Sequence, residues 1–359
     1  MSKLLPPIGI SHTAQTIEDL YAHKLDGKKK VIFHPAAQPN SFPHLGTVTS
    51  LISTFALARK LEDTLGISAE VLFWELENAP GEHHPIKGEA YYRTLANTLS
   101  AEGVSASEKH LLEFRYLLKT FSEFSGVPSK TWSYGEFQST PEIRRIILDL
   151  IAMEDELAPL LCPSERKFKV RFACPVCHLS NKKGGVFVGA TGNGGRDYEC
   201  FCPAHGTYGG TLSEHNKDLF DINTPVRALA REIYYIRKMD SENGQNMMSD
   251  GADWVQYATI NMEALLRFGI PLDKHPARFF SPVILDESGA KLAKSAQIGS
   301  GRYNHLPRHT VDSTWLRRTF GEAVHRNLWD EVSSWQHDSR SLFRNYTVGY
   351  FAALLGEGV

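Results

Sequence analysis

Apolar residues follow two patterns along the chain, short continuous runs and helical spacing. Val31–Phe33 and Ala69–Trp74 are short apolar runs, which are typical of buried strands. From Val48 to Leu65 the apolar residues instead recur every three or four positions, and Gly66 follows where the end of a helix favours glycine. A strand, a loop, a helix and a second strand in this order predict the opening of a doubly wound parallel sheet.

Helical spacing returns over much of the remaining sequence. Thr140 and Thr224 each precede a proline, which predicts two helix starts, the first with a capping hydroxyl. The region 88–161 is expected to be mostly helical. Further helical segments are predicted at 16–22, 107–124, 253–268, 315–320, 322–335 and 341–355.

The loop between the first strand and its helix has the features of an anion site. A helix N-terminus favours phosphate through its free N–H groups and its dipole. Gly46 would let a ligand approach the backbone, and His44 can donate a hydrogen bond to phosphate oxygens.

Pro39–Thr47 resembles the HIGH signature of class I aminoacyl-tRNA synthetases, with Thr47 where a second histidine often stands. The resemblance implies a catalytic role for His44 in amino-acid adenylation. The residues that it implies for ATP binding here are Pro39, Asn40, His44, Gly46 and Thr47.

A second segment, Phe279–Ser295, begins as an apolar strand and continues through an acidic, glycine-containing turn to two lysines. Flexible lysines beside a glycine suit a loop that closes over a triphosphate, where charge develops during transfer. The segment resembles the KMSKS signature of the same family, although Ala293 replaces its first serine. The resemblance implies that Lys291 and Lys294 are catalytic and bind ATP, and that Ser295 binds ATP.

A third segment, Asp250–Gln256, resembles the Gly-x-Asp-x-x-Gln substrate-binding segment of several such synthetases. It implies that Gly251 and Asp253 contact ATP, and that Asp253 and Gln256 orient adenosine or the amino acid.

Charged side chains suggest two further contacts. Glu75 and Glu77 follow the second strand, and the carboxyl ends of parallel strands are where ligands bind in such sheets. Either glutamate would then hold a substrate ammonium group, unless the segment is a solvated loop. We expect four cations to form a solvated helix face, unless an acceptor or a phosphate contacts them. These cations are Arg227, Arg231, Arg237 and Lys238.

Four of the five cysteines lie in one stretch. Cys174-Pro-Val-Cys177 and Cys202-Pro-Ala-His205 each separate two ligands by two residues, so that both side chains of a turn can reach one tetrahedral zinc. We therefore expect structural Zn²⁺ on these four residues, with Cys200 competing against His205 for the fourth place. The alternative is a set of ordinary reduced cysteines.

Composition bounds the class of protein. The 359 residues suffice for two domains, or for one large α/β domain with insertions, and the hydrophobic content of 42% is normal for a globular protein. The sequence contains no apolar run of about 20 residues, so no membrane span is expected, and the N-terminus lacks the apolar core of a signal peptide. We therefore expect a cytoplasmic protein with no membrane partner. The net charge of -2 gives no broad basic field, although a local basic face stays open.

The fold prediction is α/β, with a Rossmann-like doubly wound parallel sheet, a helical and zinc-bearing insertion, and a short helical C-terminal tail. The resemblance covers roughly 30–300, and the tail is expected to be too short for the anticodon-binding domain usual in the family. The zinc knuckles agree with the class I lysyl type. The expected divisions are 1–84 and 213–300 for the two halves of the catalytic domain, 85–161 for the helical insertion, 162–212 for the zinc ribbon and 301–359 for the tail.

The resemblance implies ATP-dependent activation of an amino acid to an aminoacyl adenylate, with Mg²⁺ bound together with ATP. The acceptor stays open between a small amine and the acceptor end of a tRNA. One alternative is an inactive paralogue that binds ATP or an amino acid as a sensor, for which Thr47 and Ala293 are the support. Another is a small nucleotidyltransferase related to pantothenate ligases, against which the zinc-bearing insertion argues.

Overall fold

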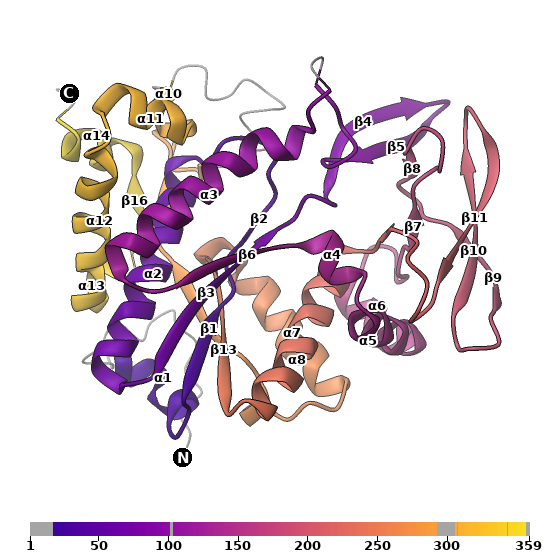
Figure 1. The fold of residues 1–359 in the computed structure, drawn as a ribbon, viewed down its shortest axis with the longest axis horizontal. Helices are drawn as coiled ribbons and strands as arrows, with labels where there is room; N and C mark the ends of the chain where they lie inside the picture. The colour runs from indigo at the N-terminus through magenta and orange to yellow at the C-terminus, as the bar shows by residue number, and fades with distance from the viewer. Residues whose placement is uncertain (1–16, 101–102, 293–305, 307, 343, 357–359) are drawn as a thin grey trace.

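The computed structural model describes residues 17–100, 103–292, 306, 308–342 and 344–356, so Lys294 and Ser295 lie outside the described residues. Its centre is a six-stranded parallel sheet (Figure 1). The strands are β1 (Lys30–Phe33), β2 (Ala36–Ala37), β3 (Ser68–Glu75), β6 (Ser129–Ser133), β13 (Gly244–Gly251) and β14 (Ala277–Ser281).

The order of these strands identifies the topology. The two-residue β2 continues the line of β1 past His34 and Pro35 and pairs with the end of β3. The other five strands lie in the order β14-β13-β1-β3-β6, and every pairing is parallel. Numbered along the chain, this is the 3-2-1-4-5 order of doubly wound sheets. The predicted α/β class and the Rossmann-like parallel sheet are confirmed.

Alternating side chains of the strands separate two cores. Val31 and Phe33 of β1 pack into one core, whereas Ile32 packs into the other, because successive strand residues point to opposite faces. The first core, which we call the α2-side core, includes residues of α1 (Ile17–Leu25), α2 (Leu45–Leu65) and α3 (Ala106–Ser125). The second, which we call the α7-side core, includes residues of α7 (Thr224–Ser241) and α8 (Val255–Arg267).

Helix α2 ends where its sequence predicts. Gly66 has a φ of 65°, in the left-handed region that glycine adopts at low cost, and its N–H donates to the carbonyl of Glu62. The apolar positions from Val48 to Leu61 are buried, because α2 packs against the sheet and also against α3 and α12 (Val324–Ser334).

The region 85–161 is mostly helical, as predicted, but it also contains strands. Its helices are α3, α4 (Tyr134–Gln138), α5 (Pro141–Ala152) and α6 (Glu154–Leu161), and its strands include β5 (Glu89–Thr94) and β6. β5 forms a hairpin with β4 (Pro80–Ile86), and β6 joins the central sheet beside β3. Thr140 precedes α5, but its hydroxyl donates to the carbonyl of Phe137 instead of capping the helix.

Beyond α6 the chain forms short antiparallel sheets that extend from one end of the molecule (Figure 1). Their longest strands, β10 and β11, pair directly, and β9 lies on the other side of β10. The strands here are β7 (Arg171–Phe172), β8 (Ser180–Asn181), β9 (Val186–Ala190), β10 (Arg196–Cys202), β11 (Gly206–Leu212) and β12 (Phe220–Asp221).

The C-terminal residues belong to the α2-side core. Leu316, Leu328 and Trp335 are buried in it, and β15 (Ile284–Leu285) pairs in parallel with β16 (Tyr346–Thr347). The helices here are α10 (Arg308–Val311), α11 (Ser313–Phe320), α12 (Val324–Ser334), α13 (Ser339–Leu342) and α14 (Val348–Leu354). Three single-turn helices complete the described chain: η2 (Ala252–Trp254), η3 (Leu272–Lys274) and η4 (Trp335–His337).

Within the described residues, no helix combines the length and the apolar character that crossing a membrane requires.

Candidate functional site

A cavity of about 700 Å³ lies at the carboxyl edge of the central sheet. Its walls come from the residues after β1, the ends of β13 and β14, and the first turns of α2. β1 leads into α2 on one face of the sheet, and the neighbouring β13 leads to α8 on the other face. The connections therefore diverge at this point, which is where doubly wound sheets bind ligands.

His44 caps the helix that borders this cavity. Its Nδ1 accepts a hydrogen bond from the backbone N–H of Thr47 over 3.2 Å, and its Nε2 lies 3.5 Å from the Thr47 hydroxyl. Because Nδ1 is the acceptor, the neutral imidazole carries its proton on Nε2. A Cβ at Gly46 would lie 3.0 Å from His44 Cε1 and 3.1 Å from Nδ1, so any other residue here would displace the ring slightly.

The cavity wall fits a polar ligand at the start of α2. His44, Gly46 and Thr47 all line it, as does Asn40. The Asn40 Oδ1 atom is buried and has no hydrogen-bond partner among the described residues. A buried acceptor without a partner is costly unless a ligand or water satisfies it.

Lys291 and Asp253 meet at the same cavity. Their side chains form an ion pair, and both line the wall. Lys291 stands at the end of a hairpin in which the Asp286 carboxylate accepts hydrogen bonds from the N–H groups of Ser288 and Ala290. The acidic, glycine-containing turn therefore orients Lys291 toward the segment after β13.

The other predicted site residues are not all in the cavity wall. Gly251 lines it, whereas Gln256 is exposed and does not. Pro39 is also outside the wall, and its carbonyl lies 3.0 Å from the Nδ1 atom of His110.

The two glutamates after β3 have partners within the protein. Glu75 accepts two hydrogen bonds of 2.9 Å from Arg115, and Glu77 accepts from the Ser133 hydroxyl and from the N–H of Gly135, each over 2.7 Å. Neither glutamate lines the cavity. Glu77 instead satisfies the free N–H groups at the start of α4.

The arginines of α7 contradict the predicted solvated face. Arg227 and Arg231 are 4% and 8% exposed, and both line the cavity, whereas Arg237 is exposed as predicted. Arg227 pairs with Asp221 over 2.9 Å. The four-residue spacing of the buried pair places both on one helix face, which is the signal in the sequence that could have located them.

Asp250 and His34 were not expected at the site. Asp250 lines the cavity, and burial raises the pKa of its carboxyl to about 6. His34 is buried directly after β1 and does not line the cavity; Trp74 donates to its Nδ1, and its Nε2 lies 3.1 Å from Asn246 Oδ1. Burial and the nearby charge of Arg231 lower the pKa of His34 to about 3, so its ring is neutral.

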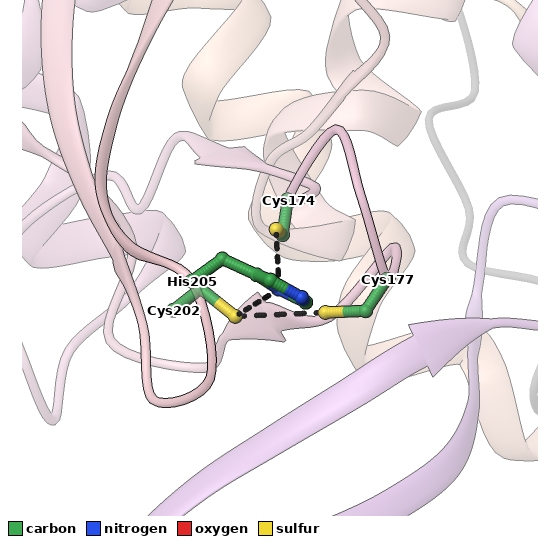
Figure 2. Close-up of side chains that lie close together, drawn as sticks. All are labelled: Cys174, Cys177, Cys202 and His205. Atoms are coloured by element: carbon green, nitrogen blue, oxygen red, sulfur yellow. Dashed lines mark hydrogen bonds between the residues drawn. The ribbon is translucent and has the colours of Figure 1, made fainter.

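The four predicted zinc ligands converge in the antiparallel region, with their side chains pointing toward one another (Figure 2). The His205 Nδ1 atom lies 3.5 Å from Cys174 Sγ and 3.4 Å from Cys202 Sγ, and the Sγ atoms of Cys177 and Cys202 are 3.5 Å apart. A tetrahedral zinc with ordinary Zn–S and Zn–N bonds needs ligand atoms roughly 3.5–3.8 Å apart. The cluster therefore fits a metal ion.

Cys200 lies outside this cluster. It is buried in the α7-side core, and a Cβ at Gly185 would lie 2.7 Å from its Sγ. Cys200 and Cys202 are two positions apart on β10 and point to the same face, but Cys200 packs against Gly185 and away from the other ligands. The cluster of possible ligands thus contains His205 and not Cys200.

No protein-family model matches the sequence, and no curated protein does. Among solved structures, methionyl-tRNA synthetase of Mycobacterium tuberculosis with bound methionyl-adenylate is similar over 91% of this chain and 68% of that chain, at 14% identity and a TM-score of 0.43. A putative arginyl-tRNA synthetase of Campylobacter jejuni is similar over 88% of this chain and 68% of that chain, at 10% identity and a TM-score of 0.39. At such identities the chemistry has to be argued from this chain's own residues.

Proposed function

We propose that the protein activates an amino acid with ATP and forms an aminoacyl adenylate. An oxygen of the substrate carboxylate would bond to the α-phosphorus, while the bond from that phosphorus to the bridging oxygen breaks and pyrophosphate leaves. The aminoacyl group would then pass to a small amine or to the acceptor end of a tRNA, while its bond to the phosphate breaks and AMP leaves.

The observation that carries this proposal is the ion pair between Lys291 and Asp253 at a cavity that His44 also lines. These residues come from three separate segments, each of which resembles a signature of class I aminoacyl-tRNA synthetases. Their meeting at the point where the sheet connections diverge gives the three resemblances one common location.

The proposed roles follow from position and charge. The start of α2, with Asn40, Gly46 and Thr47, would bind the phosphates of ATP, and His44 would donate from Nε2 as charge develops on them. Lys291, and Lys294 beyond the described residues, would close over the phosphates, with Mg²⁺ bound alongside. Asp253 would orient the substrate.

The Cys3His cluster is proposed to hold Zn²⁺ in a structural role. Cys174, Cys177, Cys202 and His205 supply four ligands, which complete a tetrahedral shell and leave no position for a reacting molecule. The ion would fix two turns of the antiparallel region together.

Hydroxylamine trapping tests activation without knowledge of the acceptor. The full-length chain is incubated with ATP, Mg²⁺, hydroxylamine and a mixture of amino acids, and hydroxamate is measured. We expect ATP-dependent hydroxamate, with a large loss in Asp253→Ala. Asp155→Ala removes an exposed carboxylate of α6 and serves as the control.

A sensor that binds ATP without activating an amino acid is the second candidate, because Thr47 and Ala293 depart from the two signatures. ATP binding without hydroxamate from any amino acid would favour it.

A further inference from the structure

Arg231 is a buried cation without a counter-ion contact. It is 8% exposed, and its guanidinium lies 5.5 Å from the centre of the Trp74 ring. It forms no hydrogen bond or ion pair with any residue that the structure describes, and its Nε is buried without a partner. An unpaired buried charge is expensive, so a partner that is present only in the working protein would explain this one.

The neighbouring arginines show what a satisfied cation at this site looks like. Arg227 pairs with Asp221 over 2.9 Å and also donates to the Thr224 hydroxyl. Arg278 pairs with Glu232, with one contact of 2.6 Å. Each of these arginines therefore has an anion of its own, and Arg231 differs from both.

Arg231 and the start of α2 border the cavity from opposite faces of the sheet. Trp74, which its guanidinium covers, belongs to the α7-side core, whereas α2 packs on the opposite face of the sheet. The cavity extends over the edge of the sheet and includes both Arg231 and His44 in its walls. We therefore assign to Arg231 an anion other than the phosphates proposed at the first turn of α2.

We propose that the amino acid activated by this protein carries a second anionic group, a side-chain carboxylate, which Arg231 binds. The inference rests on the proposed adenylation. In that reaction the α-carboxylate must stay free to attack the α-phosphate near α2, so it cannot be the group held at Arg231. A guanidinium beside an indole ring keeps its N–H donors available for a planar carboxylate.

Asp250 completes the charge pattern that an acidic amino acid requires. It lines the same cavity and has no hydrogen bond or ion pair from its side chain among the described residues. Arg231 and Arg278 attract its negative charge, yet burial still raises its pKa to about 6. A substrate ammonium near Asp250 would stabilise the carboxylate form while the side-chain carboxylate pairs with Arg231.

Calorimetric titration tests the pairing directly. The full-length protein is titrated with L-aspartate, L-glutamate and L-2-aminoadipate, and with asparagine and glutamine as neutral isosteres. We expect at least one acid to bind roughly 30-fold or more tightly than its neutral counterpart, which is the low end for a buried charge pair. Equal binding of acid and amide, or no binding of any of the three acids, would overturn the proposal.

Matched variants of α7 assign the preference to one side chain. Arg231→Gln should abolish the preference for the acid, and Arg231→Lys should retain part of it. Arg237→Gln, which removes an exposed arginine from the same helix, should leave it intact. The melting temperature of Arg231→Gln should be equal or higher, since the variant removes an unpaired buried charge. A fall in melting temperature with unchanged selectivity would make Arg231 a structural residue and overturn the proposal.

Pyrophosphate exchange with the same amino acids separates this inference from the proposed function. Exchange with a neutral amino acid, together with no binding of acids, rejects the acidic substrate and keeps adenylation. Arg231-dependent binding of an acid without exchange rejects adenylation and keeps the carboxylate site.

Discussion

His44 has two roles on the scale of a single side chain, and substitution can separate them. Its Nδ1 caps α2, while its Nε2 is the proposed donor to the phosphates. His44→Asn keeps a good capping side chain, so we expect little loss of stability but a fall in turnover on the order of 10²–10³. His44→Ala should show the same kinetic loss and also lose about 1 kcal/mol of stability. Urea unfolding and pyrophosphate exchange measure the two effects. Equal turnover in His44→Asn and wild type would remove His44 from the reaction.

Gly46 controls the position of that ring. In Gly46→Ala the new Cβ would be 3.0 Å from His44 Cε1, so the imidazole must shift. We expect turnover to fall by about tenfold or more, because small displacements of a reacting group are costly. Gly349→Ala is a suitable control, since its Cβ would have no neighbour closer than 3.8 Å. Full activity in both variants would show that the ring position does not matter.

His34 makes stability depend on pH. Its pKa is lowered to about 3 in the folded chain, below the value of about 6.5 of an unfolded histidine. The unfolded chain therefore binds the extra proton, and stability is fully present above pH 6.5 and falls as the pH drops toward 3. We expect a loss of about 1.4 kcal/mol per pH unit below pH 6 from this group alone. His325, with a pKa lowered to about 4, acts in the same direction.

The check is urea unfolding between pH 5 and pH 7.5. His34→Gln should show a shallower pH dependence than wild type, whatever its absolute stability. An identical slope in the two proteins would contradict the assignment.

Among the structural elements, the pair of Cys-bearing turns gives the clearest prediction. Purified protein should contain about one zinc per chain, and Cys174→Ser should lower that content and destabilise the antiparallel region. Cys200→Ser is the matched control, because Cys200 is outside the ligand cluster. Metal analysis and limited proteolysis follow both effects. Full zinc content in a variant lacking both Cys174 and Cys177 would refute the site.

The lysine-bearing loop after β15 should act on the rate of reaction. Lys294→Ala should slow pyrophosphate exchange on the order of 10²–10³, with a smaller change in the KM for ATP, because the charge develops in the transition state. Lys291→Ala should be milder, since the resemblance gives Lys291 the more peripheral position. A Lys294→Ala enzyme with the exchange rate of wild type would reject this loop as catalytic.

Helices and local turns were well predicted because their signals are local. Apolar spacing and Gly66 located α2, and the CPVC and CPAH turns located a ligand cluster that the structure brings together. One error concerns a partner that is distant in sequence. β6 is short and half-exposed, and only its pairing with β3 makes it a strand of the central sheet. A second error is local, because the hydroxyl of Thr140 donates to the carbonyl of Phe137 instead of capping α5.

On the scale of the whole molecule, the sequence predicted a doubly wound sheet but not the contents of its cavity. The order of motifs along the chain implied that His44, Asp253 and Lys291 belong to one site, and the fold places all three in one wall. Arg231 was assigned to solvent because its helix has cations at several positions. Only the packing of α7 against the sheet decides which of them are buried.

Amino-acid-dependent exchange of labelled pyrophosphate into ATP is the most direct test of the central claim. It should be measured on the full-length, zinc-loaded chain with each standard amino acid, with and without Mg²⁺. We predict exchange that requires both Mg²⁺ and an amino acid and that His44→Asn reduces by about two to three orders of magnitude. An absence of exchange with every amino acid, from protein that is folded and binds ATP, would contradict activation and leave a binding protein in its place.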